Sequence, residues 1–488
     1  MTEPHYLSAT EILHRYRART LSPVELVRAV IARAERVEPH VNAFAEEMFE
    51  QALRAAAAAE KRYRPGGDPR PLEGLPVAAK EEQPLAGHPV TDGTLLRPAR
   101  VARETAVGLA RIQAAGGILH ARTTTSEFCC MPLSHTRRWG VTRNPWNPDA
   151  SAGGSSGGSA AALAAGTATL ATGSDIGGSL RAPASFNGVV GYKPPHGRIP
   201  VLPPAGLDPY FHHGPMARTV ADTALLHNVM AGPDPRDPAS TGRPAVSVPA
   251  DLAGVRGLRI AVSTAPGDFP VDPEIRTRTA EAAEGLRAAG AVVEEVEIGW
   301  RLEDINRALW AHFGQGGAAE ILALDRAHPG VITPYTLAFA RRGMAAAPTV
   351  DPAEGRRLEA AVRKQLAIVL TGFDAFVLPT VGARAFAAGE DYVETDLVVN
   401  GVPLAHFADA SLTPAFNICS AHPVLSVPSG RASNGVPTGV QIVTAPDAET
   451  TAFRIAAAVE QTAGTGFTAG WEPQLPLGGP ANTDTAPR

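Results

Sequence analysis

Residues 150–191 read ASAGGSSGGSAAALAAGTATLATGSDIGGSLRAPASFNGVVG, and this stretch decides the interpretation of the chain. Its paired glycines stand beside four serines: Ser155, Ser156, Ser159 and Ser179. Glycines around a serine let the backbone approach a substrate and turn successive N–H groups toward one point. Residues 175–179 form a turn that leads into a helix, which we expect to start within 180–186. A turn of this geometry can form an oxyanion hole from its backbone N–H groups. A flexible linker is the plain alternative, but the apolar segments 160–165 and 167–172 argue against it.

Other serine and metal motifs fit less well. Residues 153–157 match the G-x-S-x-G nucleophile elbow of α/β-hydrolases. However, residues 144–152 do not read as a buried strand, and the late histidines His406 and His422 are weak candidates for the base. The pair at 212–213 lacks an H-E-x-x-H partner, so we expect no metal site.

Lysine is rare in this chain. Of the 44 basic residues, four are lysines: Lys61, Lys80, Lys193 and Lys364. Arginine is effectively always charged, whereas a buried lysine can lose its proton. Lys80 ends the apolar run 75–79, which predicts a buried strand, while Lys61 and Lys364 lie in charged helical surroundings. Neither Lys80 nor Lys193 follows a glycine as a phosphate-binding loop requires. Lys80 is therefore the lysine that needs a chemical explanation.

Composition excludes several classes of protein. The 488 residues carry 44 basic and 49 acidic side chains, so there is no basic footprint for nucleic acid or an anionic membrane. Three cysteines, Cys129, Cys130 and Cys419, cannot form a disulfide framework and suit a reducing compartment. We find no apolar signal-peptide core near the start and no run long enough to span a bilayer. A cytoplasmic enzyme is the expectation.

The order of elements predicts an α/β protein. Two capping boxes, at 8–11 and 22–25, predict that the first 65 residues form helices packed on the core. Strands and helices then alternate: strands within 75–80, 118–121, 258–262 and 291–298, and helices over 103–115 and 273–289. Such alternation is typical of a sheet covered by helices. We expect one domain over 66–475, with a helical insertion at 300–370 that shapes the substrate site, and a disordered tail at 476–488.

At this point the sequence resembles the amidase signature enzymes. Their central signature matches three segments: 74–80, 153–159 and 173–194. Further matches follow: 143–148, 214–218 with Asp222, Asn417, Pro428, Gly430 and 435–441. The resemblance covers roughly residues 20–465. It implies a single α/β domain in which a large mixed central β-sheet is flanked by α-helices on both faces.

The resemblance also implies a Ser-cisSer-Lys triad. Carried over by motif, Ser179 is the nucleophile, Ser155 is the bridging serine after a cis peptide, and Lys80 is the base. The implied oxyanion hole consists of four backbone N–H groups: Ile176, Gly177, Gly178 and Ser179. Asp175 and Arg181 are expected to hold the loop, and no cofactor or metal is implied. The residue pattern alone leaves Ser155 and Ser156 equivalent.

Several positions depart from the family pattern. Ser174 replaces the usual threonine before Asp175, and residues 81–83 (Glu-Glu-Gln) replace the usual aspartate after the base. Ala182 and Asn187, together with the segment 194–200, differ from the A-type component of the tRNA-dependent amidotransferase. A stand-alone hydrolase of small apolar or aryl amides, or of aryl carbamates, is therefore favoured. It would act as a monomer or homodimer. The alternatives are a catalytically silent binding protein and the A-type component of such an amidotransferase.

The segments expected to line the pocket are rich in aromatic residues. They are 129–139, 200–213 and 303–345, and their aromatic residues include Trp139, Tyr210, Phe211, Trp310 and Phe313. Few charges accompany them, which favours an apolar or aryl acyl group.

Overall fold

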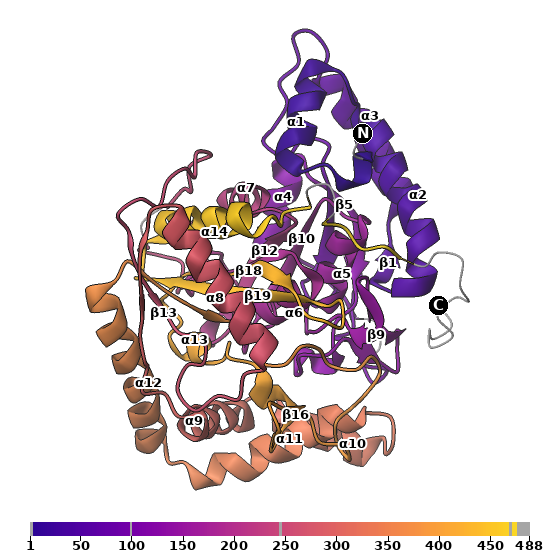
Figure 1. The fold of residues 1–488 in the computed structure, drawn as a ribbon. Coiled ribbons are helices and arrows are strands. Elements are labelled where there is room, and N and C mark those ends of the chain that lie inside the picture. The colour runs from indigo at the N-terminus through magenta and orange to yellow at the C-terminus, as the bar shows by residue number, and fades with distance from the viewer. Residues whose placement is uncertain (1–2, 98–99, 244–245, 468–470, 476–488) are drawn as a thin grey trace.

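A large mixed sheet forms the centre of the molecule (Figure 1). The computed structural model describes residues 3–97, 100–243, 246–467 and 471–475, so the expected disordered tail, 476–488, lies outside the described residues. Within them the sheet has eleven strands in the spatial order β1 (Phe44–Glu47), β5 (Ile118–Thr123), β2 (Pro76–Lys80), β10 (Leu170–Asp175), β12 (His212–Ala217), β11 (Val190–Lys193), β18 (Val424–Arg431), β19 (Pro437–Thr444), β15 (Ala375–Pro379), β13 (Arg259–Val262) and β14 (Val292–Glu295). β2 runs parallel to β5 and β10, and β13 runs parallel to β14 and β15.

Helices cover both faces of this sheet. The helices of the described residues are α1 (Ala9–Ala18), α2 (Pro23–Val41), α3 (Phe49–Arg62), α4 (Val107–Ala114), α5 (Gly157–Ala165), α6 (Arg181–Asn187), α7 (Val220–Met230), α8 (Pro273–Ala288), α9 (Leu302–Gln315), α10 (Ala318–Ala327), α11 (Pro334–Ala346), α12 (Pro352–Gly372), α13 (Ala415–Ile418) and α14 (Glu449–Ala463). Along β11, Val190 and Tyr192 pack in one core with α7, α8 and α14, whereas Gly191 faces α6. Since side chains alternate across a strand, these helices lie on opposite faces. The predicted α/β class is confirmed.

The glycine-rich stretch is ordered because its small side chains let α5 enter the core. Every residue of α5 is buried, which is typical of a helix that is apolar all round. A Cβ at Gly157 would lie 2.2 Å from Ser134 Oγ, and one at Gly158 would lie 2.5 Å from Thr124 Oγ1. Larger residues would force α5 away from the strands beneath it. The segment is therefore a packed helix and not a linker.

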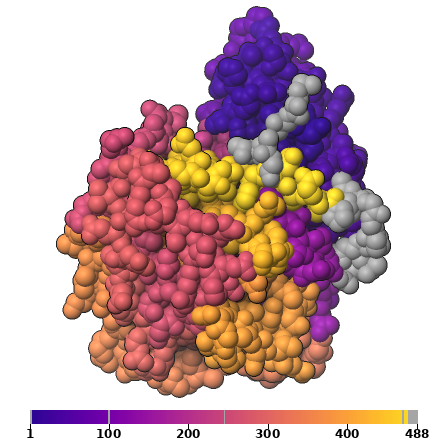
Figure 2. Space-filling model, in the orientation of Figure 1, coloured from indigo at the N-terminus to yellow at the C-terminus, as the bar shows by residue number. Residues whose placement is uncertain are grey.

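The N-terminal region contains a strand that the sequence did not predict. Ser22 and Glu25 form the expected capping box at the start of α2, and Ser8 caps α1. Between α2 and α3, however, β1 pairs antiparallel with β5 at the edge of the central sheet. Helices α1 to α3 project as a lobe from the rest of the molecule (Figure 1, Figure 2).

The segment after β14 is helical, as predicted for 300–370. Helices α9 to α12 follow one another there, and α9 packs against α11 and α12 (Figure 1). Within the described part of the chain, four two-stranded sheets lie outside the central sheet: β3 (Pro89–Val90) with β4 (Arg100–Val101), β6 (His135–Thr136) with β7 (Gly140–Val141), β8 (Arg143–Asn144) with β9 (Asn147–Ser151), and β16 (Val398–Val399) with β17 (Val402–Pro403). Across the described ranges, we find no helix with the length and apolarity needed to cross a bilayer.

Candidate active site

Lys80 is buried at the end of β2, next to the end of β10. Its Nζ donates hydrogen bonds to Ser155 Oγ at 2.6 Å and to Ser174 Oγ at 2.8 Å, and its side chain has no exposed area. β2 and β10 are parallel neighbours, so their carboxyl ends meet at one edge of the sheet. This topology brings Lys80 to Ser174, one of the residues that depart from the family pattern.

The two adjacent serines of the glycine-rich turn have different partners. The peptide bond between Gly154 and Ser155 is cis, as the resemblance implied. Ser155 Oγ accepts from Lys80, whereas Ser156 Oγ donates to the carbonyl of Ser174 at 3.2 Å and accepts from its N–H at 3.3 Å. Ser156 therefore connects the turn to β10 by hydrogen bonds. The structure thus gives different partners to two serines that the residue pattern could not distinguish.

Ser179 lies in the turn between β10 and α6 and lines a cavity. Its side chain is 8% exposed, and its Oγ makes no hydrogen bond to any described residue. The carbonyl of Ser179 accepts from the N–H of Ser156 at 3.3 Å, which joins this turn to the Gly154–Ser155 turn. Gly154 lines the same cavity as Ser179. The structure therefore brings together the segments that carry the three predicted triad residues.

A buried ion pair holds the turn that carries Ser179. The carboxylate of Asp175 accepts from the N–H groups of Gly178 at 2.8 Å and Leu180 at 3.2 Å. It also accepts from Arg181 at 2.9 and 3.0 Å and from Asn417 at 2.8 Å. Burial alone would raise the pKa of Asp175, but the Arg181 charge and the bonds from Arg181 and Asn417 hold it well below its usual range. These bonds tie the N–H groups on both sides of Ser179 to one buried carboxylate.

Arg181 extends this network to distant parts of the chain. Its guanidinium donates to the carbonyl of Thr413 at 2.9 Å and to the side-chain oxygens of Gln441 and Asn417, both at 2.8 Å. A guanidinium presents five N–H donors in a fixed planar arrangement, so a single arginine side chain can bind several acceptors at once. The sequence placed Asn417 and Gln441 in the family pattern but indicated no role for either.

Gly178 occupies a conformation and a space that exclude other residues. Its φ is +127°, and a Cβ there would lie 1.9 Å from Thr413 Oγ1. That hydroxyl donates to the carbonyl of Gly177 at 2.7 Å. A Cβ at Gly177 would meet nothing nearer than Phe313 Cζ at 3.7 Å. Packing thus requires glycine at position 178, whereas a Cβ at position 177 would make only an ordinary van der Waals contact with Phe313.

The backbone N–H groups of this turn are used in two ways. Among the described residues, the N–H groups of Ile176, Gly177 and Ser179 have no hydrogen-bond partner, whereas that of Gly178 donates to Asp175. Gly178 was expected to be a fourth donor to the substrate oxygen. Its N–H belongs instead to the bonds that shape the loop, which leaves three of the expected donors.

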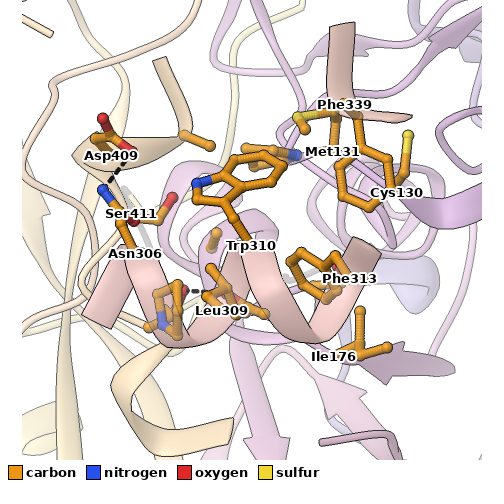
Figure 3. Close-up of a pocket in the computed structure, with 18 of the residues that line it drawn as sticks. Cys130, Met131, Ile176, Asn306, Leu309, Trp310, Phe313, Phe339, Asp409 and Ser411 are labelled. Atoms are coloured by element: carbon orange, nitrogen blue, oxygen red, sulfur yellow. Dashed lines mark hydrogen bonds between the residues drawn. The ribbon is translucent and has the colours of Figure 1, made fainter. Parts of the chain in front are cut away.

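The cavity beside Ser179 is mostly apolar (Figure 3). Two of the expected aromatic residues, Trp310 and Phe313 of α9, line it, and Cys130 and Met131 come from the expected segment 129–139. The other three expected aromatic residues do not line this cavity: Trp139, Tyr210 and Phe211. Tyr210 stacks on the ring of His312 instead, with centroids 3.9 Å apart.

The Glu-Glu-Gln segment places a carboxylate near the lysine. Glu82 Oε1 lies 4.0 Å from Lys80 Nζ, and its Oε2 lies 3.9 Å from His213 Nε2. Burial lowers the pKa of His213, although Glu82 opposes the shift. Gln83 donates to the carbonyl of Gly173 at 3.0 Å. The departure from the family pattern therefore places a carboxyl group beside the expected base and ties residue 83 to β10 by a hydrogen bond.

A second lysine is buried nearby but lacks the same partners. Burial and the charge of Arg181 lower the pKa of Lys193 to about 7, against the opposing effect of Asp175. Its Nζ donates to the carbonyl oxygens of Pro194 at 3.3 Å and His422 at 3.0 Å. Among the described residues, Lys193 Nζ thus forms no hydrogen bond with Ser155, Ser156 or Ser179. Its burial was not predicted from the sequence.

The alternative nucleophile elbow is not supported by the fold. Residues 147–151 do form a strand, β9, but it belongs to a hairpin outside the central sheet. Burial lowers the pKa of His406 to about 3, and His422 Nδ1 lies 2.8 Å from the carbonyl of Thr444. Within the described ranges, neither imidazole forms a hydrogen bond with a serine of the two glycine-rich turns.

Comparison with known proteins identifies the family. The profile of the Amidase family matches residues 25–452. An acylamidase from Rhodococcus erythropolis is 33% identical over 91% of this chain and 93% of its own length. The A-type component of the glutamyl-tRNA(Gln) amidotransferase from Chloroflexus aggregans is 31% identical over 94% of this chain and 97% of its own. The crystal structure of a bacterial aryl acylamidase of the amidase signature family has a TM-score of 0.86 at 30% identity, covering 94% and 97% of the two chains.

The chain belongs to the amidase signature family. It is an amidase-type enzyme, and the predicted fold and family are confirmed.

Proposed function

We propose that this enzyme cleaves carboxylic amide C–N bonds with Ser179 as nucleophile, Ser155 as proton relay and Lys80 as base. The contact that supports this most strongly is the 2.6 Å hydrogen bond between Lys80 Nζ and Ser155 Oγ in a fully buried setting. Ser179 stands in the adjoining turn with its Oγ free of protein partners among the described residues. Catalytic hydrogen bonds commonly tighten only when substrate is bound, so the relay to Ser179 would close at that stage.

The steps balance in protons and bonds. Ser179 Oγ attacks the amide carbon while its proton passes to Ser155, and the proton of Ser155 passes to neutral Lys80. The C–N bond then breaks as that proton returns through Ser155 to the leaving nitrogen. Water next adds to the acyl-enzyme along the same relay, which releases the carboxylic acid and restores the Ser179 hydroxyl.

The oxygen that becomes negative in the tetrahedral intermediate needs donors in place. The N–H groups of Ile176, Gly177 and Ser179 are without partners among the described residues, and they belong to one turn beside the nucleophile. Each well-placed donor of this kind contributes about 3–4 kcal/mol to the transition state. Asp175 and Arg181 fix the loop, so the donors require no rearrangement.

The cavity favours small substrates with an apolar or aryl acyl group. Its lining is dominated by apolar side chains such as Leu309, Trp310, Phe313 and Phe339. The similarity to an acylamidase and an aryl acylamidase supports the same substrate class. Aryl carbamates present a carbonyl of related geometry and form a second class to be tested.

An A-type subunit of a tRNA-dependent amidotransferase is the second candidate. The full-length similarity to the A-type component from Chloroflexus aggregans favours it. The differences at Ala182, Asn187 and residues 194–200 favour the stand-alone hydrolase. The two candidates differ in whether the chain needs protein partners.

Assay of the purified chain alone separates them. We expect hydrolysis of p-nitroanilides, primary amides or aryl carbamates without a partner, and no loss of activity on treatment with a chelator. The chain supplies nucleophile, base and oxyanion donors itself, so nothing else is needed. The Ser179→Ala variant, which lacks the proposed nucleophile, serves as the negative control for hydrolysis by contaminants. Activity confined to preparations with co-purifying proteins, or loss of activity on chelation, would contradict the proposal.

A further inference from the structure

Besides Ser179, two residues in the wall of the apolar cavity carry a buried side-chain polar atom without a hydrogen-bond partner among the described residues. Trp310 and Ser411 both line the cavity and are only 4% and 5% exposed. Within the described residues, neither Trp310 Nε1 nor Ser411 Oγ forms a hydrogen bond. Buried polar groups are nearly always paired, because an unpaired one forfeits its hydrogen bonds with water. A pair of them in a substrate cavity therefore points to a polar group of the substrate.

The indole of Trp310 cannot turn away to find another partner. Its ring packs against Phe339, with centroids 5.6 Å apart, and against His406 at 5.2 Å. The guanidinium carbon of Arg342 lies 4.7 Å from the centroid of the same ring. These contacts fix the direction of the indole N–H. A donor held this rigidly selects an acceptor at one place.

The polar atoms gather at one side of the indole. In Figure 3 the indole nitrogen faces Asp409 and Ser411, whereas Phe313 and Phe339 lie toward the other side of Trp310. Phe313 lies next to the turn that carries Ser179, because a Cβ at Gly177 would be 3.7 Å from Phe313 Cζ. A substrate that extends from this turn past Trp310 would therefore meet the polar atoms at its far end.

The charges nearby are already engaged. Asp409 accepts from Asn306 Nδ2 at 3.0 Å, and its other carboxylate oxygen lies 3.9 Å from Arg342. Burial raises the pKa of Asp409, and the same buried setting penalises any further charge that is brought in beside it. An indole N–H can only donate, and a hydroxyl can donate or accept. The chemistry therefore fits an uncharged acceptor and not an ammonium or a carboxylate.

The position of the relay assigns this cavity to the acyl side. A leaving nitrogen must approach Ser155 to receive its proton. Ser179 and Gly154 line the cavity, whereas the side chains that carry the proton, Ser155 and Lys80, do not. We therefore place the acyl group of the substrate in this cavity and its leaving nitrogen on the side of Ser155.

We infer that the cavity selects acyl groups that are apolar along their length and end in an uncharged hydrogen-bond acceptor, received by Trp310 Nε1 and Ser411 Oγ. This inference rests on the proposed function, because it takes Ser179 as the acylated residue. It goes beyond that function by naming the group that the substrate carries at its far end.

A matched pair of substrates tests the inference. The first is the p-nitroanilide of 4-acetylphenylacetic acid, and the second carries 4-isopropenyl instead, which exchanges the acceptor oxygen for a methylene group. A second pair, the p-nitroanilides of 3-(4-acetylphenyl)propionic acid and 3-(4-isopropenylphenyl)propionic acid, lengthens the acyl chain by one methylene group. We expect kcat/KM to favour the acetyl member by about tenfold or more at one of the lengths. Trp310→Phe and Ser411→Ala should each reduce that ratio at least threefold, while Leu309→Met, a change to the apolar lining, should preserve it.

Binding gives a reading that does not depend on turnover. The same four amides titrated into Ser179→Ala should show the same preference in Kd. Equal kcat/KM within each pair, or equal Kd within each pair, would overturn the inference while leaving amide hydrolysis intact. A ratio that survives in both Trp310→Phe and Ser411→Ala would overturn it as well. If the proposed function were wrong, no amide of either length would be hydrolysed. The Kd values measured with Ser179→Ala would still test the inference in that case.

Discussion

Replacing Lys80 by arginine should abolish amide hydrolysis as completely as replacing it by alanine. The side chain is fully buried and reaches Ser155 Oγ at 2.6 Å, so in the proposed mechanism it must accept a proton there. A guanidinium stays protonated in proteins, so arginine keeps the positive charge but cannot act as the base. We expect kcat/KM to fall about 10⁴-fold or more for both variants, the scale of loss when one member of a triad is removed.

Steady-state kinetics on a p-nitroanilide, with circular dichroism to verify folding, provides the measurement. Lys61→Arg is the matched control, because it makes the same exchange at an exposed position and should leave the rate unchanged. If Lys80→Arg kept a large share of the wild-type rate, Lys80 would be a structural cation and the base would lie elsewhere.

Removing the charge of Asp175 should destabilise the protein strongly. Its carboxylate is fully buried and receives bonds from Gly178, Leu180, Arg181 and Asn417. In Asp175→Asn the guanidinium of Arg181 would remain buried without a counter-charge. Breaking one partner of a buried pair costs about 3–5 kcal/mol of the free energy of unfolding.

Urea denaturation at several pH values tests this expectation. The pKa of Asp175 is lower in the folded protein than in the unfolded chain, so its charge stabilises the fold above about pH 4. That contribution is lost as the pH falls through the folded-state pKa, and the difference between wild type and Asp175→Asn should narrow with it. Glu294→Gln breaks the half-exposed ion pair with Arg259 and should cost less than about 1 kcal/mol. Equal losses in both variants would show that burial of the Asp175 pair contributes nothing.

The sequence predicted the fold class and the segments of the site because both depend on local patterns. The run before Lys80 is apolar and forms β2, and the small residues 157–165 form a helix that only small residues allow so deep in the core. Strand β1 was missed because Phe44–Glu47 is short and carries two glutamates, and its partner β5 lies far along the chain. Pairing between distant segments leaves no periodic signal in either of them.

The finer details of the site depend on contacts between segments that the chain separates widely. Ser174 looked like a mild substitution, yet it hydrogen-bonds Lys80 across two parallel strands. The N–H of Gly178 could be assigned to Asp175 only once the turn had a definite conformation. Ser411 and Thr413 follow no motif, and they reach the cavity because the chain before α13 passes beside the turn of Ser179. Of Gly178, Ser411 and Thr413, only Gly178, as part of the pair Gly177–Gly178, could be recognised from the sequence.

Covalent labelling tests the central claim, that Ser179 is the nucleophile, most directly. Intact-mass spectrometry after treatment with a sulfonyl or phosphonyl fluoride should show a single adduct, and peptide mapping should place it on Ser179 within residues 174–181. Lys80→Ala should label far more slowly, since the relay that removes the serine proton is lost. An adduct on Ser155 or Ser156, with Ser179 unmodified, would contradict the assignment of the nucleophile.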